Sequence, residues 1–248
     1  MEFLDLKDIS ERDLELINPT SVEKIITVGN SAGLEPGKRV IDFGSGYAEP
    51  LVLWADYFGI SGLGIEVRPI ACERAQEKIK KRGVRDRVEI VCASASEYSF
   101  EPHAYDVAAC VGATFIWGGF EPTLQAIKEA VHPAGRLIVG EPYWNRYEVP
   151  QSVLDQLKGI FREYELLEMI RRQGYELAYV VRASQDDWDR YQAGNWQGLL
   201  KWLEENPQHP ERQQVLDHLH EDQEWYLRFG REYLGWAIYV LTPHDPRW

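Results

Sequence analysis

Short apolar runs alternate with stretches of helical spacing between residues 39 and 141, and this alternation limits the fold more than any other feature. The runs are RVIDF (39–43), GLGIE (62–66), VEIVCA (88–93), YDVAACV (105–111) and GRLIVGE (135–141). Continuous apolar runs are typical of parallel strands that are covered on both faces. Between the first two runs, Leu51, Trp54 and Phe58 share one helical face. The pattern predicts a doubly wound α/β sheet.

The last hundred residues depart from this alternation. A sixth apolar run, YELAYVVRAS (175–184), and a seventh, YLGWAIYVLTP (233–243), flank a long aromatic-rich stretch with helical spacing from 186 to about 229. We interpret the two runs as strands and the stretch between them as a helical insertion. An insertion at this point is expected to form a lid over the carboxyl edge of the sheet.

The start of the chain is predicted to be helical. Ser10-x-x-Asp13 and Thr20-x-x-Glu23 resemble capping boxes, which open helices. We therefore expect three parts. They are an N-terminal helical segment covering the site (1–35), an α/β core (36–184 and 230–248) and a helical lid insertion (185–229).

The charge balance bears on possible partners. The chain carries 27 Lys and Arg against 40 Asp and Glu, a net charge of −13, and such a surface repels phosphate backbones. Nucleic acid is therefore not expected as a partner. The cysteines show no C-x-x-C spacing, and the acidic start lacks a signal-peptide pattern. No apolar run approaches the 18 residues that a membrane-spanning helix needs. We expect a cytoplasmic protein without a membrane partner.

The first strand ends in a glycine-containing turn, VIDFGSGYAEP (40–50). Gly44 and Gly46 allow a tight turn and a close backbone approach, although an ordinary strand-to-helix turn can also use this pattern. Glu66 ends the second strand, 22 residues after Gly44, where a carboxylate can accept from both hydroxyls of a ribose. Together these residues predict a ligand that contains a nucleoside.

Two carboxylates narrow the choice of nucleoside ligand. A nicotinamide cofactor requires G-x-G-x-x-G, and here Glu49 occupies the sixth position, where it would repel a diphosphate. Asp42 precedes the turn and suits a ligand that has a positive amino group and no phosphate. S-adenosyl-L-methionine is such a ligand.

Four segments carry a resemblance to a known family. VIDFGSGYAEP, GIEVRP, YDVAACVGATFIWGGFEP and PAGRLIVGEPYW resemble the successive motifs of class I S-adenosylmethionine-dependent methyltransferases over residues 39 to 144. INPT, CVGATFIWGGF, GEPYW and DWDRYQAGNW also resemble the bacterial YjhP-like group over nearly the whole chain. The resemblance implies a mostly parallel seven-stranded sheet with an antiparallel last strand, and S-adenosyl-L-methionine as cofactor.

The resemblance also implies roles for individual residues at the cofactor. Gly44 and Gly46 would lie under its methionine part, with Asp42 fixing the turn, and Glu66 would bind the ribose. Three further positions complete the expected cofactor set: Ser94 and Ala95 flanking the adenine, and Val111 at the end of the fourth strand. Ser94 departs from the family, which often has an acidic residue at this place.

Aromatic side chains are expected around the methyl acceptor. Phe115 and Trp117 follow the fourth strand and could form a wall of the acceptor site, or simply cover the edge of the core. The other residues expected there are Tyr143 and Trp144 after the fifth strand, Trp188, Asp189 and Tyr191 in the lid, and Asn18 in the N-terminal segment.

Glu141 is the one carboxylate at the end of the fifth strand, and it is the candidate catalytic residue. It could accept a proton from the acceptor, pair with a cationic acceptor, or cap a loop. The histidines and acids of 205–213 and 218–222 show no clear pattern of metal ligands, and we expect no metal.

The sequence therefore favours methyl transfer by in-line displacement to a small, partly apolar molecule, with positioning as the main source of catalysis. The attacking atom is oxygen, nitrogen, sulfur or carbon. Alternatives are a methyltransferase acting on RNA or protein, and a nucleoside-cofactor-binding protein without transferase activity. The net charge argues against RNA.

Overall fold

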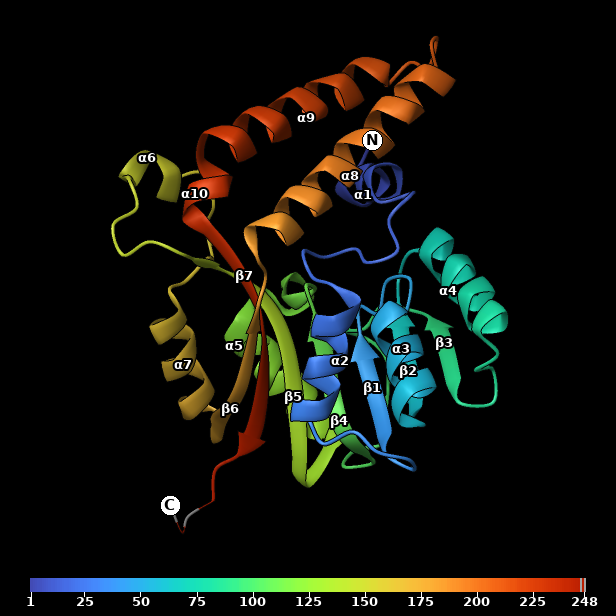
Figure 1. Cartoon of the computed structure of the whole chain (residues 1–248), viewed down its shortest axis with the longest axis vertical. Coiled ribbons are helices and arrows are strands. Elements are labelled where there is room, and N and C mark those ends of the chain that lie inside the picture. Colours follow the sequence, from blue (N-terminus) through green and yellow to red (C-terminus); the bar gives the residue numbers. More distant parts are fainter. Residues whose placement is uncertain (246, 248) are drawn as a thin grey trace.

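A computed structural model describes residues 1–245 and 247. Its centre is a seven-stranded sheet in the order β3-β2-β1-β4-β5-β7-β6 (Figure 1). The strands are β1 (Arg39–Phe43), β2 (Ser61–Glu66), β3 (Val88–Cys92), β4 (Tyr105–Val111), β5 (Val131–Trp144), β6 (Tyr175–Arg182) and β7 (Leu234–Pro243). The first five pair in parallel, whereas β7 is antiparallel to both of its neighbours, β5 and β6. The predicted doubly wound sheet with an antiparallel last strand is confirmed.

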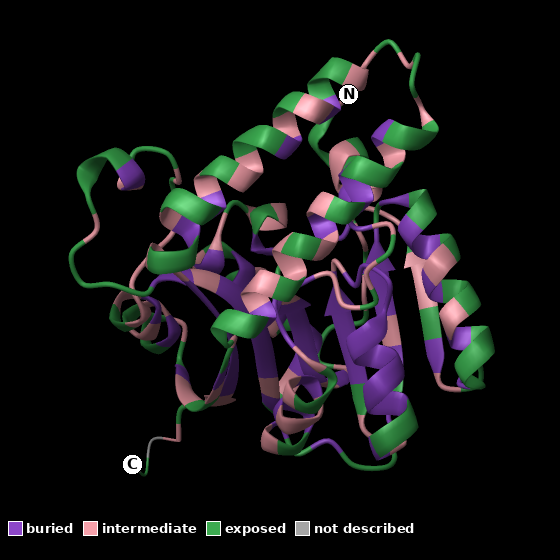
Figure 2. Cartoon of the chain, turned by 45° about the horizontal axis from the view of Figure 1, so that its top comes forward, coloured by how far each residue is buried: buried purple, intermediate pink, exposed green. Residues whose placement is uncertain are grey.

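Helices cover both faces of the sheet, as its continuous apolar strands require. One apolar layer lies under α2 (Val22–Ser31), α3 (Glu49–Phe58) and α4 (Pro69–Arg82). The other lies under α5 (Phe120–Ile127) and α7 (Glu163–Arg172). Apart from the edge strands β3 and β6, the strands between the two layers are buried along most of their length (Figure 2). The shorter elements are η1 (Thr114–Trp117), η2 (Lys128–Ala130), α6 (Gln151–Leu154), η3 (Tyr226–Gly230) and α10 (Arg231–Tyr233).

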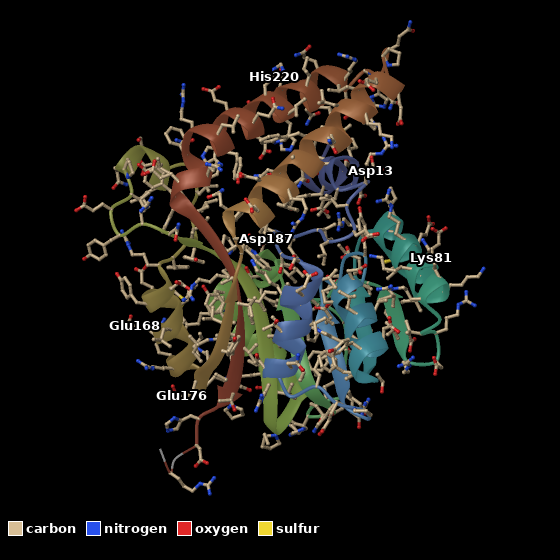
Figure 3. The ribbon with its side chains drawn as sticks, viewed as in Figure 1. Asp13, Lys81, Glu168, Glu176, Asp187 and His220 are labelled. Carbon is tan, nitrogen blue, oxygen red and sulfur yellow. The ribbon has the colours of Figure 1, made fainter. Side chains whose placement is uncertain are left out.

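Three helices lie beyond the carboxyl ends of the central strands. They are α1 (Phe3–Ser10), α8 (Gln185–Glu205) and α9 (Arg212–Trp225). The helices α8 and α9 run side by side above the sheet and share a small apolar core, and α1 packs against α8 (Figure 1). Lys24 of α2 pairs with Asp187 at the start of α8, which Figure 3 labels between that helix and the sheet.

Two helices lie near the start of the chain as predicted, but neither begins at its predicted cap, and 11–20 is not helical. Ser10 ends α1 instead of opening a helix, because Glu2 and Asp5 form the capping box, with its N-cap eight residues earlier. In α2 the N-cap is Ser21, whose side chain accepts from the Lys24 N–H, so the start lies one residue beyond Thr20. These shifts matter because they place the first ten residues over the sheet edge.

Trp54 fastens α3 to α2, and its replacement should weaken the fold. Its indole N–H donates to the carbonyl of Ile25 (2.9 Å), and both residues are fully buried. We expect Trp54→Phe to lower the free energy of unfolding by roughly 2 kcal/mol, because a hydrogen bond is lost and a void is left. Urea denaturation measures the loss. Tyr57→Phe is the control, since Tyr57 is exposed on the same helix; an equal loss in both variants would contradict the prediction.

Candidate functional site

A cavity of about 290 Å³ opens at the carboxyl ends of β1, β2 and β4. Its floor is the sheet edge, and its outer wall comes from α1, the segment that follows α1, and Tyr191 of α8. Parallel strands leave such a crevice where helices depart to opposite faces of the sheet. Six of the seven predicted cofactor residues line it: Asp42, Gly44, Glu66, Ser94, Ala95 and Val111.

The turn after β1 is pinned to β2 by its backbone. The N–H groups of Gly44 and Ser45 both donate to the carbonyl of Ile65, at 2.8 and 3.0 Å. Gly44 has φ +72°, and a Cβ there would lie 2.5 Å from the Cβ of Ala113. Glycine is therefore required at this position by both conformation and space.

Glu66 is buried at the end of β2 and holds the same turn from the other side. Its Oε2 accepts from the Gly46 N–H (2.8 Å), which is how Gly46 takes part although it does not line the cavity. Its Oε1 accepts from the backbone N–H of Arg68 (2.9 Å) and from the Arg68 Nε (3.3 Å). A carboxylate has about four acceptor positions, and three are filled here, so Oε2 can still accept from a ligand hydroxyl.

Three buried oxygen atoms on the cavity wall have no hydrogen-bond partner within the described part of the chain. They are Oδ1 of Asn18, Oδ1 of Asp42 and Oγ of Ser45. An unpaired buried polar atom costs about 1–3 kcal/mol, so the set indicates a ligand that supplies N–H or O–H donors. The amino group of S-adenosyl-L-methionine is such a donor, and the residues present fit this cofactor.

The N-terminal wall contains a chain of polar contacts. Tyr191 of α8 donates to Oε1 of Glu11 (3.3 Å), and the Lys7 ammonium donates to Tyr191 (3.2 Å) and pairs with Glu11 (3.3 Å). The Arg68 guanidinium contacts Glu11 and also Asp8 of α1. All except Asp8 line the cavity.

The mouth of the cavity is apolar. Phe3 and Leu4 of α1, Val67 after β2 and Phe115 of η1 are exposed and line it. The rings of Phe3 and Phe115 meet edge to face with centroids 6.3 Å apart. We call these four residues the apolar rim.

Of the residues predicted around the acceptor, the structure brings Asn18, Phe115 and Tyr191 to the cavity. Trp117 lies elsewhere, which corrects that expectation. A 3₁₀ turn has three residues per turn, so side chains two positions apart point in different directions. Phe115 therefore faces the mouth, whereas Trp117 is half-buried and packs edge to face on Phe43, against the apolar layer under α5.

Tyr143 and Trp144 are also corrected, because β5 continues past Glu141 to Trp144. The extension pairs with β7, where Tyr143 lies opposite Gly235 and Trp144 opposite Leu234. Both side chains are buried and outside the cavity lining. The expected strand end was three residues short, because the apolar pattern does not reveal the antiparallel partner.

Trp188 and Asp189 belong to the packing of the α8 region. The Trp188 ring contacts Tyr191 and Tyr226, while Asp189 pairs with Arg231 (3.0 Å) and accepts from the Tyr226 hydroxyl (2.8 Å). Neither lines the cavity. Asp189 instead ties α8 to the segment that leads into β7.

Glu141 is buried and does not line the cavity either, which corrects its expected contact with the acceptor. Its Oε2 accepts from the Thr114 hydroxyl (2.6 Å) at the start of η1. Burial raises its pKa to about 7, although the bond from Thr114 acts in the opposite direction. Its position makes it a support for η1, the turn that carries Phe115.

Sequence reasoning missed Phe3 and Lys7 on α1, Glu11 directly after it, and Arg68 after β2. The first three recur at four-residue intervals, which is one face of a helix. The misplaced cap at Ser10 concealed this signal. Within residues 1–245 and 247, no cluster of three or more His, Cys, Asp or Glu is arranged to hold a metal ion. No helix in that part of the chain is long and apolar enough to cross a membrane.

Comparison with known proteins gives consistent matches. A family model described as "Methyltransferase domain" matches residues 40–135. The "Uncharacterized protein YjhP" of Escherichia coli is 33% identical over 239 residues, which cover 94% of this chain and 96% of that protein.

Two solved structures are similar over almost their full length. A SAM-dependent methyltransferase from Geobacter sulfurreducens in complex with S-adenosyl-L-homocysteine is 36% identical, with a TM-score of 0.91, over 97% of this chain and 98% of that chain. One from Thiobacillus denitrificans, in complex with the same molecule, is 33% identical with a TM-score of 0.91, over 98% of this chain and 100% of that chain.

Asp42 makes the stability of the ligand-free protein depend on pH. Burial, and to a lesser extent Glu66, raise its pKa from 3.8 to about 7. The folded chain thus keeps a proton that the unfolded chain releases near pH 4, so the stability of the wild type falls as the pH rises from about 4 to 7.

We expect Asp42→Asn, which has no such proton, to stabilise the ligand-free protein. Its gain in free energy of unfolding should be roughly 2–3 kcal/mol larger at pH 8 than at pH 5. Urea denaturation of both proteins at the two pH values measures this difference. The same gain at both values would show that Asp42 is already ionised in the folded chain at pH 5.

Proposed function

We propose, because this chain belongs to the class I S-adenosylmethionine-dependent methyltransferases, that it methylates a small and partly apolar acceptor bound in the cavity under α1 and α8. The family defines the cofactor and the reaction type. The small, partly apolar acceptor is supported by one observation: the two ends of the cavity differ in polarity. Unpaired buried oxygens lie at the inner end, and the apolar rim lies at the mouth.

The inner end suits the cofactor residue by residue. Asp42, Ser45 and Asn18 would accept from its amino group, and Oε2 of Glu66 would accept from a ribose hydroxyl. Ser94 and Ala95 would flank the adenine. At the glycine turn and at Val111, the backbone would approach the cofactor closely. When bound, S-adenosyl-L-methionine supplies a methyl group activated by a sulfonium. The carboxylates of Asp42 and Glu66 favour a ligand that carries positive charge.

The outer end suits the acceptor. Phe115 comes from η1 and Tyr191 from α8, and Phe3 and Lys7 of α1 complete that region. Such walls exclude water and orient a small molecule, and orientation alone can be worth roughly 7–11 kcal/mol in a displacement reaction. We assign residues 185–229 the role of a lid, because α8 supplies Tyr191 and holds α1 in place.

Glu11 is unsuited as a general base in this arrangement. Its two oxygens contact Arg68, Tyr191 and Lys7, so both are already engaged by side chains of the protein. Glu141 acts here as a positioning residue, because it binds Thr114 and thereby holds η1 and Phe115. Catalysis on this proposal comes from placement of the acceptor.

The test is a screen of small thiols, amines, phenols and carboxylic acids that follows release of S-adenosylhomocysteine. We expect turnover with one class of partly apolar compound. Turnover only with RNA or protein substrates would favour a macromolecular acceptor. Cofactor binding without turnover of any of these would favour a binding protein without transferase activity.

Phe115 and Trp117 form a matched pair for a sharper test once an acceptor is found. Phe115→Ala should lower kcat/KM for the acceptor roughly tenfold or more, because apolar contact is lost, and leave the affinity for S-adenosylhomocysteine unchanged. Trp117→Ala should instead lower stability by roughly 3 kcal/mol, because it opens a void beside Phe43.

Enzyme kinetics, calorimetry and urea denaturation of the two variants check these effects. If Trp117→Ala impaired acceptor turnover more than Phe115→Ala at a temperature where both are folded, the rim would not be the acceptor site.

A further inference from the structure

We propose that Arg68 is a positioning residue that joins the ribose-binding carboxylate Glu66 to α1, so that cofactor binding fixes the N-terminal wall on which the acceptor site is built. This inference rests on the cofactor placement given under the proposed function. It assigns a role to Arg68, Asp8 and Glu11, which lie outside the residues expected from the sequence.

Arg68 lies at the centre of three carboxylates from two parts of the chain. Its side chain is 9% exposed. Nε contacts Oε1 of Glu66 at 3.3 Å, while Nη1 donates to Oε2 of Glu11 at 3.0 Å and to Oδ1 of Asp8 at 3.2 Å. One guanidinium therefore links the end of β2 to the last turn of α1 and to the residue that follows it.

The same chain of contacts continues to α8. The second oxygen of Glu11 contacts the Tyr191 hydroxyl and the Lys7 ammonium, so α1 is held between the β2–α4 connection and the lid. Asp8 has no part in this second set, and so a change at Asp8 disturbs only the Arg68 side. The cofactor end and the acceptor end of the cavity are thereby joined through Arg68 and Glu11.

The buried charges of Glu11 and Glu66 explain why the contacts of Arg68 with α1 should respond to cofactor binding. Without Arg68, Glu11 and Glu66 would be two buried carboxylates on one cavity, an arrangement that is costly to keep. Arg68 can pair with α1 and orient Glu66 at the same time only when α1 is closed. A ribose hydroxyl that donates to Glu66 holds it in this orientation, and the closed position of α1 is then favoured. Cofactor binding is thus expected to precede acceptor binding.

Other contacts of the N-terminal segment serve as controls, because they join it to α8 away from the cavity. Lys201 of α8 pairs with Asp13 (3.1 Å), which Figure 3 labels on the segment that follows α1. Asp13 is exposed and does not line the cavity. Asp13→Asn removes an ion pair from the segment without touching Arg68.

The experiment uses S-adenosylhomocysteine as the probe and requires no acceptor. Hydrogen exchange of residues 3–10 is measured with and without the probe, and its dissociation rate is followed by tryptophan fluorescence. In the wild type we expect the probe to slow exchange in α1 at least tenfold. In the Asp8→Asn/Glu11→Gln double variant we expect that slowing to disappear and the dissociation rate to rise about tenfold. Asp8→Asn alone should show a smaller rise, and Asp13→Asn should match the wild type.

Glu66→Gln separates failure of this inference from failure of the cofactor placement. If Glu66→Gln weakens binding of the probe but the Asp8 and Glu11 variants match the wild type in both readouts, the role of Arg68 is overturned and the cofactor placement holds. If Glu66→Gln binds the probe as tightly as the wild type, the ribose assignment is overturned, and the link with it. Circular dichroism of each variant verifies that it is folded.

Discussion

The burial of negative charge at the carboxyl ends of β1 and β2 is the constraint around which the site is organised. Asp42 and Glu66 are both at most 5% exposed and lie on neighbouring strands, and the pKa of Asp42 is raised to about 7 in consequence. Glu66 is compensated by two backbone N–H groups and Arg68, whereas Asp42 keeps an unpaired oxygen among the described residues. A cationic ligand gains the most binding free energy beside the part of this charge that no protein group compensates.

Glycine and the parallel sheet make this burial possible. Gly44 brings the turn against Ala113, and the two N–H groups that bind the Ile65 carbonyl keep it there. The strand ends are thus held at fixed spacing by the sheet register, with Asp42 opposite Gly64. Buried charge of this kind lowers the stability of the ligand-free protein, while the sheet keeps the site in shape. Binding sites commonly reduce stability in this way.

The expected cofactor residues could be brought to one cavity from the sequence because they lie at strand ends. Asp42 and Glu66 lie at the ends of apolar runs, which is a local signal, whereas Ser94 and Val111 came from the family resemblance. The acceptor end depends on directions that only packing decides. Trp117 turned to the core because a 3₁₀ turn separates it from Phe115, and Tyr143 was buried because β7 extends the pairing of β5. Long-range pairing of this kind leaves no mark in the local pattern.

The separation of polar and apolar functions also indicates how acceptor preference can change independently of the cofactor. Phe3, Leu4 and Val67 of the apolar rim lie within four residues of Lys7 or Arg68, yet their side chains carry no hydrogen-bonding group that the network uses. Substitution at the rim therefore alters shape and apolar area at the mouth while the ion pairs of Arg68 remain. The charged interior, in contrast, tolerates little change, because removal of one partner leaves another buried charge unpaired. On the proposed function, the rim is thus the part of the cavity in which acceptor specificity can diverge.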